Sequence, residues 1–288
     1  KYTITIAGGN ATDLTASQLT GLNNLTDVAV TATAVTAIAS SSLSDVSTLL
    51  AAGADAAQFT GLGTGLTGVT LAAGDIKAAD FNTAITRADA INGDATTVFE
   101  MSAGQTITAA AADGDGTAMS HLTSLLASEA TKITTGGATG LVDQAITVTG
   151  EEISVANANT LDATTTGVVT ATITSTAYST VGDNNSLDDL TGTGNKYSIT
   201  IAGGNATNLT ASQLTALNGI TDAAITATAV TALASDSLAN VSTLLAAGAD
   251  TEQFVGLGTG LTGVTLSAGD LKAADFNTAI TRADAING

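Results

Sequence analysis

The residues of this sequence best suited to chemistry are the acidic and amide side chains of the segment VGDNNSLDDLTGTGN (181–195). Five of them fall within seven residues: Asp183, Asn184, Asn185, Asp188 and Asp189. Carboxylate and amide oxygens are the ligands that Ca²⁺ prefers, and this ion tolerates irregular geometry. We therefore predict a calcium site in this loop. The alternative is a solvated turn in which an Asp side chain caps a helix.

A second acidic group lies in DGDGT (113–117). Asp113 and Asp115 alternate like the first ligands of an EF-hand calcium loop, so we include both as candidate calcium ligands. Position 12 of such a loop falls on Ser124 instead of Glu, which excludes a complete EF-hand.

Motifs for nucleotide binding and for hydrolysis are incomplete. GTGLTG, at 63–68 and again at 258–263, fits the pattern G-x-G-x-x-G, but a predicted strand follows it where the dinucleotide motif needs a helix, so we interpret it as a tight turn. The single histidine, His121, lies on a predicted helix, and the sequence contains no G-x-S-x-G motif. We predict that the protein is not an enzyme.

The charge balance limits the partners of the protein. Lys and Arg number 7 against 26 Asp and Glu, which gives a formal net charge of −19. Nucleic acid is excluded because its recognition needs a basic surface, and no apolar run is long enough for membrane insertion. Cations are the natural partners, with plain solubility as the other explanation of the acidity. Cysteine is absent, which excludes disulfides and thiolate metal sites.

The chain repeats itself with a period of 195 residues. Residues 1–93 return as 196–288 with 16 differences, and the apolar positions among them mostly stay apolar. Residues 94–195 complete the period, so we divide the chain into one full repeat, 1–195, and the start of the next. This organisation is typical of an excerpt from a longer array and predicts self-association with further copies of the repeat.

Short strands and short helices are predicted to alternate within each repeat. YTITI, VAVTAT and VVTATIT alternate Val, Ile or Ala with Thr, the pattern of a strand with one buried face. LTASQLTGLNNL (14–25) and AADFNTAITRADAI (78–91) have helical spacing of their apolar residues, and Ser or Thr precedes several such segments as a cap. We expect an α/β solenoid, with a strand and a short helix or 3₁₀ segment in each coil and one parallel sheet along one side. An all-β solenoid is the alternative.

The runs TGLGTGLTGVTLAAGDIKAADFNTAI (60–85) and ANANTLDATTTGVVTATIT (156–174) resemble the very long β-strand repeat proteins of cyanobacteria and other aquatic bacteria. Residues 94–145 depart from that wording. The resemblance implies an extracellular surface-layer, sheath or adhesin protein without catalytic residues. We therefore expect a non-enzymatic extracellular structural protein that forms a rod, filament or surface layer. The alternative is the stalk of a large adhesin that presents a binding domain outside this fragment.

Overall fold

The chain folds as two compact units in the computed structural model. The first unit comprises Lys1–Glu151 with Thr164–Gly167, and the second comprises Glu152–Ala163 with Val168–Gly288. The structure describes residues 1–8, 12–93, 97–113, 117–174, 178, 186–201, 208–269 and 271–287. Residues 1–93 thus belong to the first unit and their copy, 196–288, to the second.

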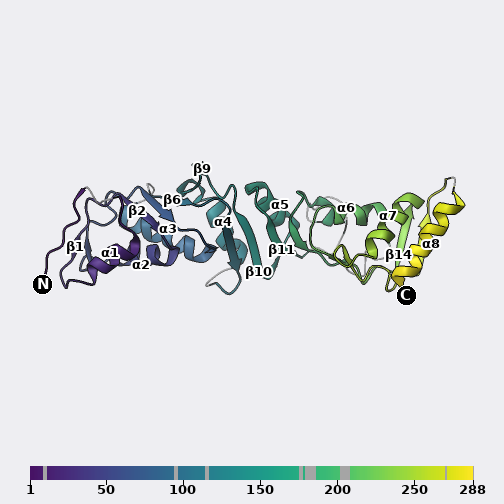
Figure 1. The fold of residues 1–288 in the computed structure, drawn as a ribbon, viewed down its shortest axis with the longest axis horizontal. Helices are drawn as coiled ribbons and strands as arrows, with labels where there is room; N and C mark the ends of the chain where they lie inside the picture. The colour runs from purple at the N-terminus through teal and green to yellow at the C-terminus, as the bar shows by residue number, and fades with distance from the viewer. Residues whose placement is uncertain are drawn as a thin grey trace. The chain divides into compact units, whose positions relative to one another are not determined.

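Short helices and strands alternate along the first unit. Its helices are α1 (Ala16–Asn23), α2 (Leu43–Gly53), α3 (Ala78–Asn92), α4 (Ala118–Leu126) and the 3₁₀ helix η2 (Ala130–Lys132). Its strands are β1 (Val30–Thr31), β2 (Ala37–Ser41), β3 (Phe59–Thr60), β4 (Gly68–Leu71), β5 (Ile76–Lys77), β6 (Val98–Met101), β7 (Thr106–Ala110), β8 (Ile133–Thr135), β9 (Ala138–Thr139) and β10 (Ala145–Ile153), which starts in this unit. Consecutive helices pack together, α1 on α2, α2 on α3 and α3 on α4 (Figure 1).

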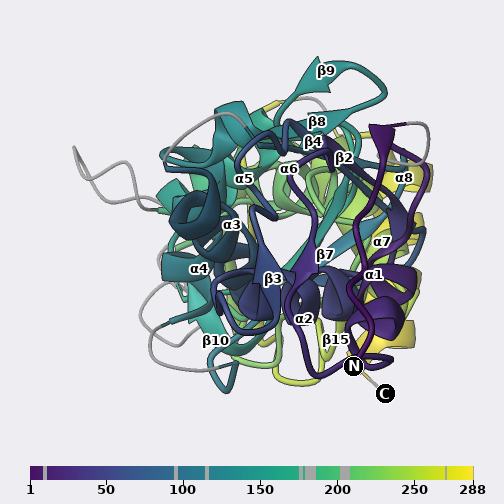
Figure 2. The same cartoon turned by 90° about the vertical axis from the view of Figure 1, so that its left-hand side faces the viewer.

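The strands of the first unit fall into three groups. Strands β2, β4, β6 and β8 are parallel in that order, and β9 joins β8 antiparallel. Figure 2 shows β2, β4 and β8 together near the top of the view. Strands β5, β7 and β10 form a second parallel group, and β1 pairs with β3. In β4 the alternate residues Val69 and Leu71 are buried, as a strand with one covered face requires.

The second unit contains the copy of residues 1–93. Its helices are α5 (Val155–Thr164, nearly all of it in this unit), η3 (Leu187–Asp189), α6 (Ala211–Asn218), α7 (Leu238–Gly248) and α8 (Ala273–Asn287). Its strands are β11 (Val169–Ile173), β12 (Lys196–Ser198), β13 (Ile225–Thr226), β14 (Ala232–Asp236), β15 (Phe254–Val255) and β16 (Gly263–Leu266). Here β11 pairs with β12, β13 with β15, and β14 with β16, all parallel.

The prediction of an α/β solenoid is wrong, and so is the all-β alternative. The structure is a mixed α/β fold with eight α-helices in its described part and several separate sheets, whereas we expected one parallel sheet along one side. The pairing of β2 with β4 shifts register between Ile38 and Ser41, and Gly136 and Gly137 turn the chain back so that β9 runs antiparallel to β8. Alternation of apolar and Thr residues specifies which face of a strand is buried, but it does not specify which other strand pairs with it.

Helix starts follow the sequence closely. The Thr15 hydroxyl accepts a hydrogen bond from the Gln18 backbone N–H at 3.2 Å, and the Gln18 side chain accepts one from the Thr15 backbone N–H at 2.9 Å. This reciprocal capping box satisfies two N–H groups that the first turn of α1 leaves without helical partners. Thr210 and Gln213 repeat it at the start of α6, with distances of 3.2 and 2.8 Å.

The core consists of small aliphatic side chains and a few aromatic rings. Phe59, Phe81 and Phe99 are fully buried in the first unit, and Tyr197 and Phe254 in the second. Phe81 of α3 and Phe99 of β6 meet edge to face, with ring centroids 5.6 Å apart. This edge-to-face geometry is favourable for two aromatic rings. The contact packs α3, which belongs to residues 1–93, against β6 of the segment that follows.

Each helix of residues 1–93 recurs 195 residues later, α1 as α6, α2 as α7 and α3 as α8. Strand pairing recurs too, since Val30 opposite Phe59 becomes Ile225 opposite Phe254. Strand β5 is an exception, because the corresponding residues 271–272 form no strand. In the first unit β7 pairs with β5, so a segment that differs only by Ile76 in place of Leu271 forms a strand where its neighbour is present.

Candidate functional site

The structure describes three of the seven predicted calcium ligands. Asp113, Asp188 and Asp189 are described, whereas Asp115, Asp183, Asn184 and Asn185 lie outside the described residues. The carboxylate of Asp113 is 3.1 Å from the Lys77 ammonium and accepts a hydrogen bond from the Ala110 backbone N–H at 3.2 Å. Within the described ranges, no three His, Asp or Glu side chains come together in a way that could hold a metal ion.

Asp188 and Asp189 lie in the 3₁₀ helix η3. The Asp189 carboxylate accepts a hydrogen bond from the Ser186 backbone N–H at 3.0 Å and so caps this helix. Partial burial and the nearby charge of Asp188 together raise the pKa of the Tyr178 hydroxyl. Calcium binding by the loop that contains both acids stays a prediction.

The GTGLTG segment is a turn that leads directly into β4. Gly63 has φ of 99°, and a Cβ atom there would lie 2.6 Å from Cγ1 of Ile91 on α3. Position 63 therefore needs glycine, because α3 packs against this turn.

His121 lies on α4, where its backbone carbonyl accepts a hydrogen bond from the Asn82 side chain at 2.8 Å.

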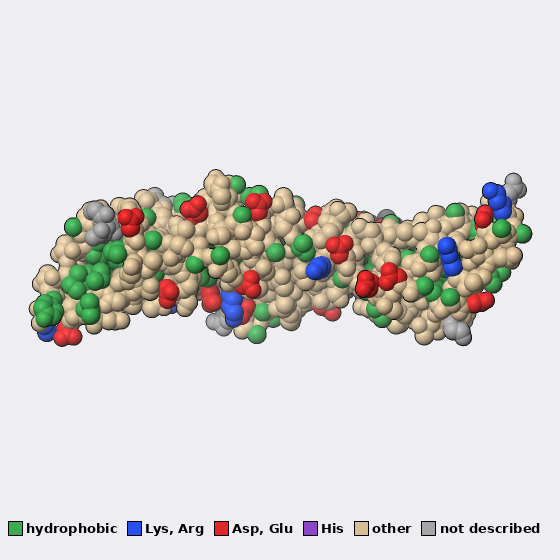
Figure 3. All heavy atoms as spheres, viewed as in Figure 1, with side chains coloured by type: hydrophobic (Ala, Val, Ile, Leu, Met, Phe, Trp, Pro, Cys, Tyr) green, Lys and Arg blue, Asp and Glu red, His purple; other side chains and the backbone are tan. Residues whose placement is uncertain are grey.

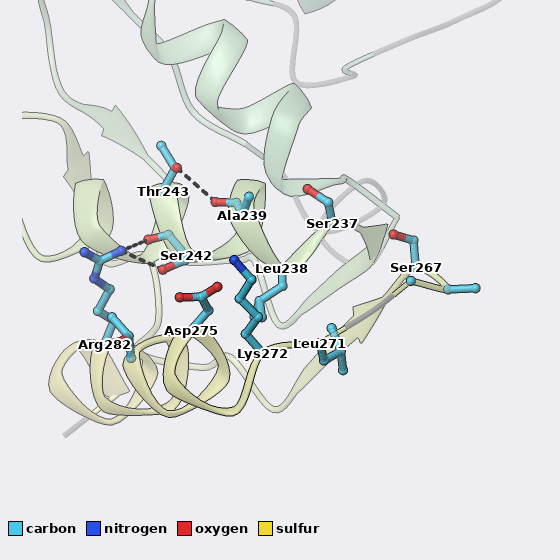
Figure 4. Close-up of a pocket in the computed structure, with 13 residues that line it drawn as sticks. Ser237, Leu238, Ala239, Ser242, Thr243, Ser267, Leu271, Lys272, Asp275 and Arg282 are labelled. Carbon is cyan, nitrogen blue, oxygen red and sulfur yellow. Dashed lines mark hydrogen bonds between the residues drawn. The ribbon is translucent and has the colours of Figure 1, made fainter.

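A polar groove occurs twice, 195 residues apart. One copy, of about 520 Å³, lies between α2 and α3, and the other, of about 540 Å³, between α7 and α8. The Arg87 guanidinium donates to the backbone oxygen and the hydroxyl of Ser47, at 2.8 and 2.6 Å. Figure 4 shows Arg282 reaching across to Ser242 in the same way, at 2.7 and 2.6 Å. Each arginine therefore ties two helices together beside its groove.

One difference between the copies changes a helix terminus, because Asp236 replaces Ser41. The Asp236 carboxylate accepts hydrogen bonds from the backbone N–H groups of Ser212 and Ser237 and from the Asn240 side chain, each at 2.7 Å. Burial disfavours the charged form, but these hydrogen bonds outweigh it and lower the pKa of Asp236 to about 2.

We expect the substitution Asp236→Ser, which restores the residue of the first copy, to remove a pH-dependent stabilisation. The contribution is fully present above the unfolded pKa of about 3.9 and is lost as the pH falls through the folded value of about 2. At about pH 6 the loss should be about 1 kcal/mol, less than the full pKa difference implies, because solvent screens a partly exposed carboxylate. Urea unfolding at about pH 6 and about pH 2 tests this, and an equal effect at both would contradict it.

An apolar surface that is buried in the first copy is exposed in the second. The buried side chains are Val69, Ile76, Phe81 and Ile85, each at most 3% exposed, and their counterparts are Val264 (38%), Leu271 (51%), Phe276 (40%) and Ile280 (45%). We call these four counterparts the C-terminal face. They lie on β16, on α8 and on the segment between them, and Figure 1 shows α8 at the C-terminal end of the chain.

Residues 97–113 and 117–133 cover this surface in the first copy. Strand β6 pairs with β4, so that Phe99 lies opposite Val69, and β7 pairs with β5. Helix α4 packs on α3. In the second copy β16 pairs with β14 in a two-stranded sheet, which leaves its other edge open in the described part of the chain. An open strand edge beside exposed apolar side chains is a template for another strand.

A pocket of about 200 Å³ lies on the C-terminal face. Val241, Leu245, Val264, Phe276 and Ile280 are among its apolar lining residues. Val241 and Leu245 are buried, like their first-copy counterparts, whereas Val264, Phe276 and Ile280 are 38–45% exposed. The pocket therefore opens where these three side chains lack the cover that their first-copy counterparts have.

The N-terminal end of the first unit shows the reverse contrast. Tyr2 is 75% exposed and its copy, Tyr197, is fully buried. The Tyr197 hydroxyl donates to the backbone oxygen of Ala158 on α5, at 3.4 Å. Leu25 is also exposed, and Figure 3 shows apolar side chains gathered at the end that Figure 1 marks N. Residues from the interval 94–195 therefore cover a surface of each copy.

We did not predict the C-terminal face from the sequence, although the sequence contains a signal for it. Residues 1–93 occur twice in the chain, but residues 94–195 occur once. Within the given sequence, only the first copy is followed by those residues. Spacing alone did not show that Val69, Phe81 and Ile85 would face that cover.

Comparison with known proteins identifies no relative. No family model matches the chain, and neither a curated protein nor a solved structure matches it. Among the described helices, none combines the length and apolar character needed to span a bilayer. The resemblance to β-strand repeat proteins consequently stays a hypothesis that rests on the quoted motifs.

Proposed function

We propose that the protein is a non-enzymatic extracellular structural protein whose repeat copies associate into a rod, filament or surface layer. One observation carries the proposal: the same apolar surface is covered in the first copy and exposed in the second. Contiguous exposed apolar side chains on a folded domain mark interaction sites. The first copy thus shows this surface with its cover in place, and the second copy shows the same surface exposed.

The charge distribution supports assembly through that surface. Acidic side chains outnumber basic ones by 26 to 7, and Figure 3 shows them spread over the visible surface. The C-terminal face itself consists of Val, Leu, Phe and Ile. Like charges keep copies apart elsewhere, so burial of the apolar face is the favourable way for copies to meet.

Electron microscopy of chains with increasing numbers of repeats tests the proposal. We expect particle length to grow by an equal increment for each added 195 residues, and we expect ordered lateral or end-to-end association. Particles of constant length would contradict a structural repeat. Lengthening without any association would favour the adhesin-stalk alternative.

A further inference from the structure

We propose that the C-terminal face binds the segment of another repeat copy that corresponds to residues 97–133. The segment adds a strand to the open edge of β16 and places the counterpart of Phe99 against Phe276. The inference rests on the proposed function and names the contact through which copies associate.

The backbone of the second copy is already arranged for this strand. In the first copy, Val98 donates its backbone N–H to the Thr67 oxygen at 3.0 Å, and β6 continues parallel to β4. Strand β16 has the same sequence as β4, GVTL. Its inner edge is also paired alike, because Leu233 lies opposite Val264 as Ile38 lies opposite Val69. The outer edge of β16 therefore offers the donors and acceptors that β6 uses.

The pocket on the C-terminal face fits an aromatic ring. Phe99 is fully buried in the first copy and meets the Phe81 ring at 5.6 Å with an interplanar angle of 76°. Phe276 is the counterpart of Phe81, is 40% exposed and lines the pocket of about 200 Å³. A buried ring at the centre of an apolar patch is the usual source of binding energy at an interface.

Polar contacts specify this segment over any other apolar peptide. The Gln105 side chain donates to the Ala72 backbone oxygen at 3.0 Å, and Asp113 pairs with Lys77 at 3.1 Å. In the second copy Ser267 occupies the position of Ala72 and offers the same backbone oxygen. Lys272 occupies the position of Lys77 and is exposed. Hydrogen bonds at fixed positions along the strand set its register, which a generic apolar sequence does not reproduce.

Calorimetry with the full chain and a separate polypeptide of residues 94–151 as the probe tests the inference. We expect saturable binding with one probe per chain. Phe276→Ala in the chain, or Phe99→Ala in the probe, should weaken binding at least about ten-fold. Val264→Asp should abolish binding, because it buries a charge beside the pocket. Leu25→Ala removes an exposed apolar side chain of the first unit and should leave the affinity unchanged.

A second measurement tests the inference even if the separate probe does not fold in isolation. The chain is extended by residues 94–195 after Gly288, and amide hydrogen exchange is followed in β16. We expect slower exchange at Val264–Leu266 than in the original chain, and Phe99→Ala in the added segment should reverse the protection. Absent binding together with unchanged exchange would overturn the inference. A dimer of the original chain that Phe276→Ala dissociates would also overturn it, because the occupant would then be a whole second chain. If repeats still lengthen the particles in either case, the proposed function stands without this contact.

Discussion

Replacing Phe81 by alanine is expected to lower the free energy of unfolding of the first unit by about 3–5 kcal/mol. Replacing its copy, Phe276, should cost the second unit at most about 2 kcal/mol. The two residues stand in the identical sequence AADFNTAI. Phe81 is fully buried against Phe99, whereas Phe276 is 40% exposed, so its truncation opens no closed cavity. Denaturant titration followed by hydrogen exchange of each unit measures both losses.

Phe59 and Phe254 provide the matched control for this comparison. They are 2% and 1% exposed and pair with corresponding strands of the two copies. Replacing either by alanine should therefore cost nearly the same amount. Equal losses for Phe81 and Phe276 would mean that the C-terminal face is covered in solution or that the burial of Phe81 contributes little.

Helix ends were the most predictable part of the fold. Capping by Thr15 depends on Gln18 three residues away, so the local sequence contains the whole interaction. Sheet formation depended on distant residues instead. Ile76 and Lys77 form a strand because β7 lies beside them, whereas Leu271 and Lys272 do not. A pattern read along the chain therefore predicted element types better than their arrangement.

The same limit applies to the predicted metal ligands. Asp113 alternates with Asp115 in a Gly-rich sequence, which suggested a calcium ligand. Its carboxylate also pairs with Lys77, 36 residues away, and calcium binding at Asp113 stays a prediction. Buried polar side chains also bind partners that are distant in sequence, since the Gln144 amide donates to the Ser102 backbone oxygen at 3.1 Å, 42 residues away along the chain. Such partners come together only in the folded chain, so residue type at short spacing could not separate a ligand from a structural contact.

The substitution Gly63→Ala is expected to destabilise the first unit by about 3 kcal/mol or more. Two costs add: Gly63 has φ of 99°, which an L side chain adopts only with strain, and the new Cβ would meet Ile91 Cγ1 at 2.6 Å. Gly104→Ala is the control, because its φ of 73° carries a similar strain but no atom lies within 4 Å of the added Cβ; it should cost about 1–2 kcal/mol. Adding Ile91→Ala to Gly63→Ala should recover part of the steric cost, which a double-mutant cycle in urea measures. Equal effects of the two glycine substitutions would show that the packing of α3 on this turn does not require glycine.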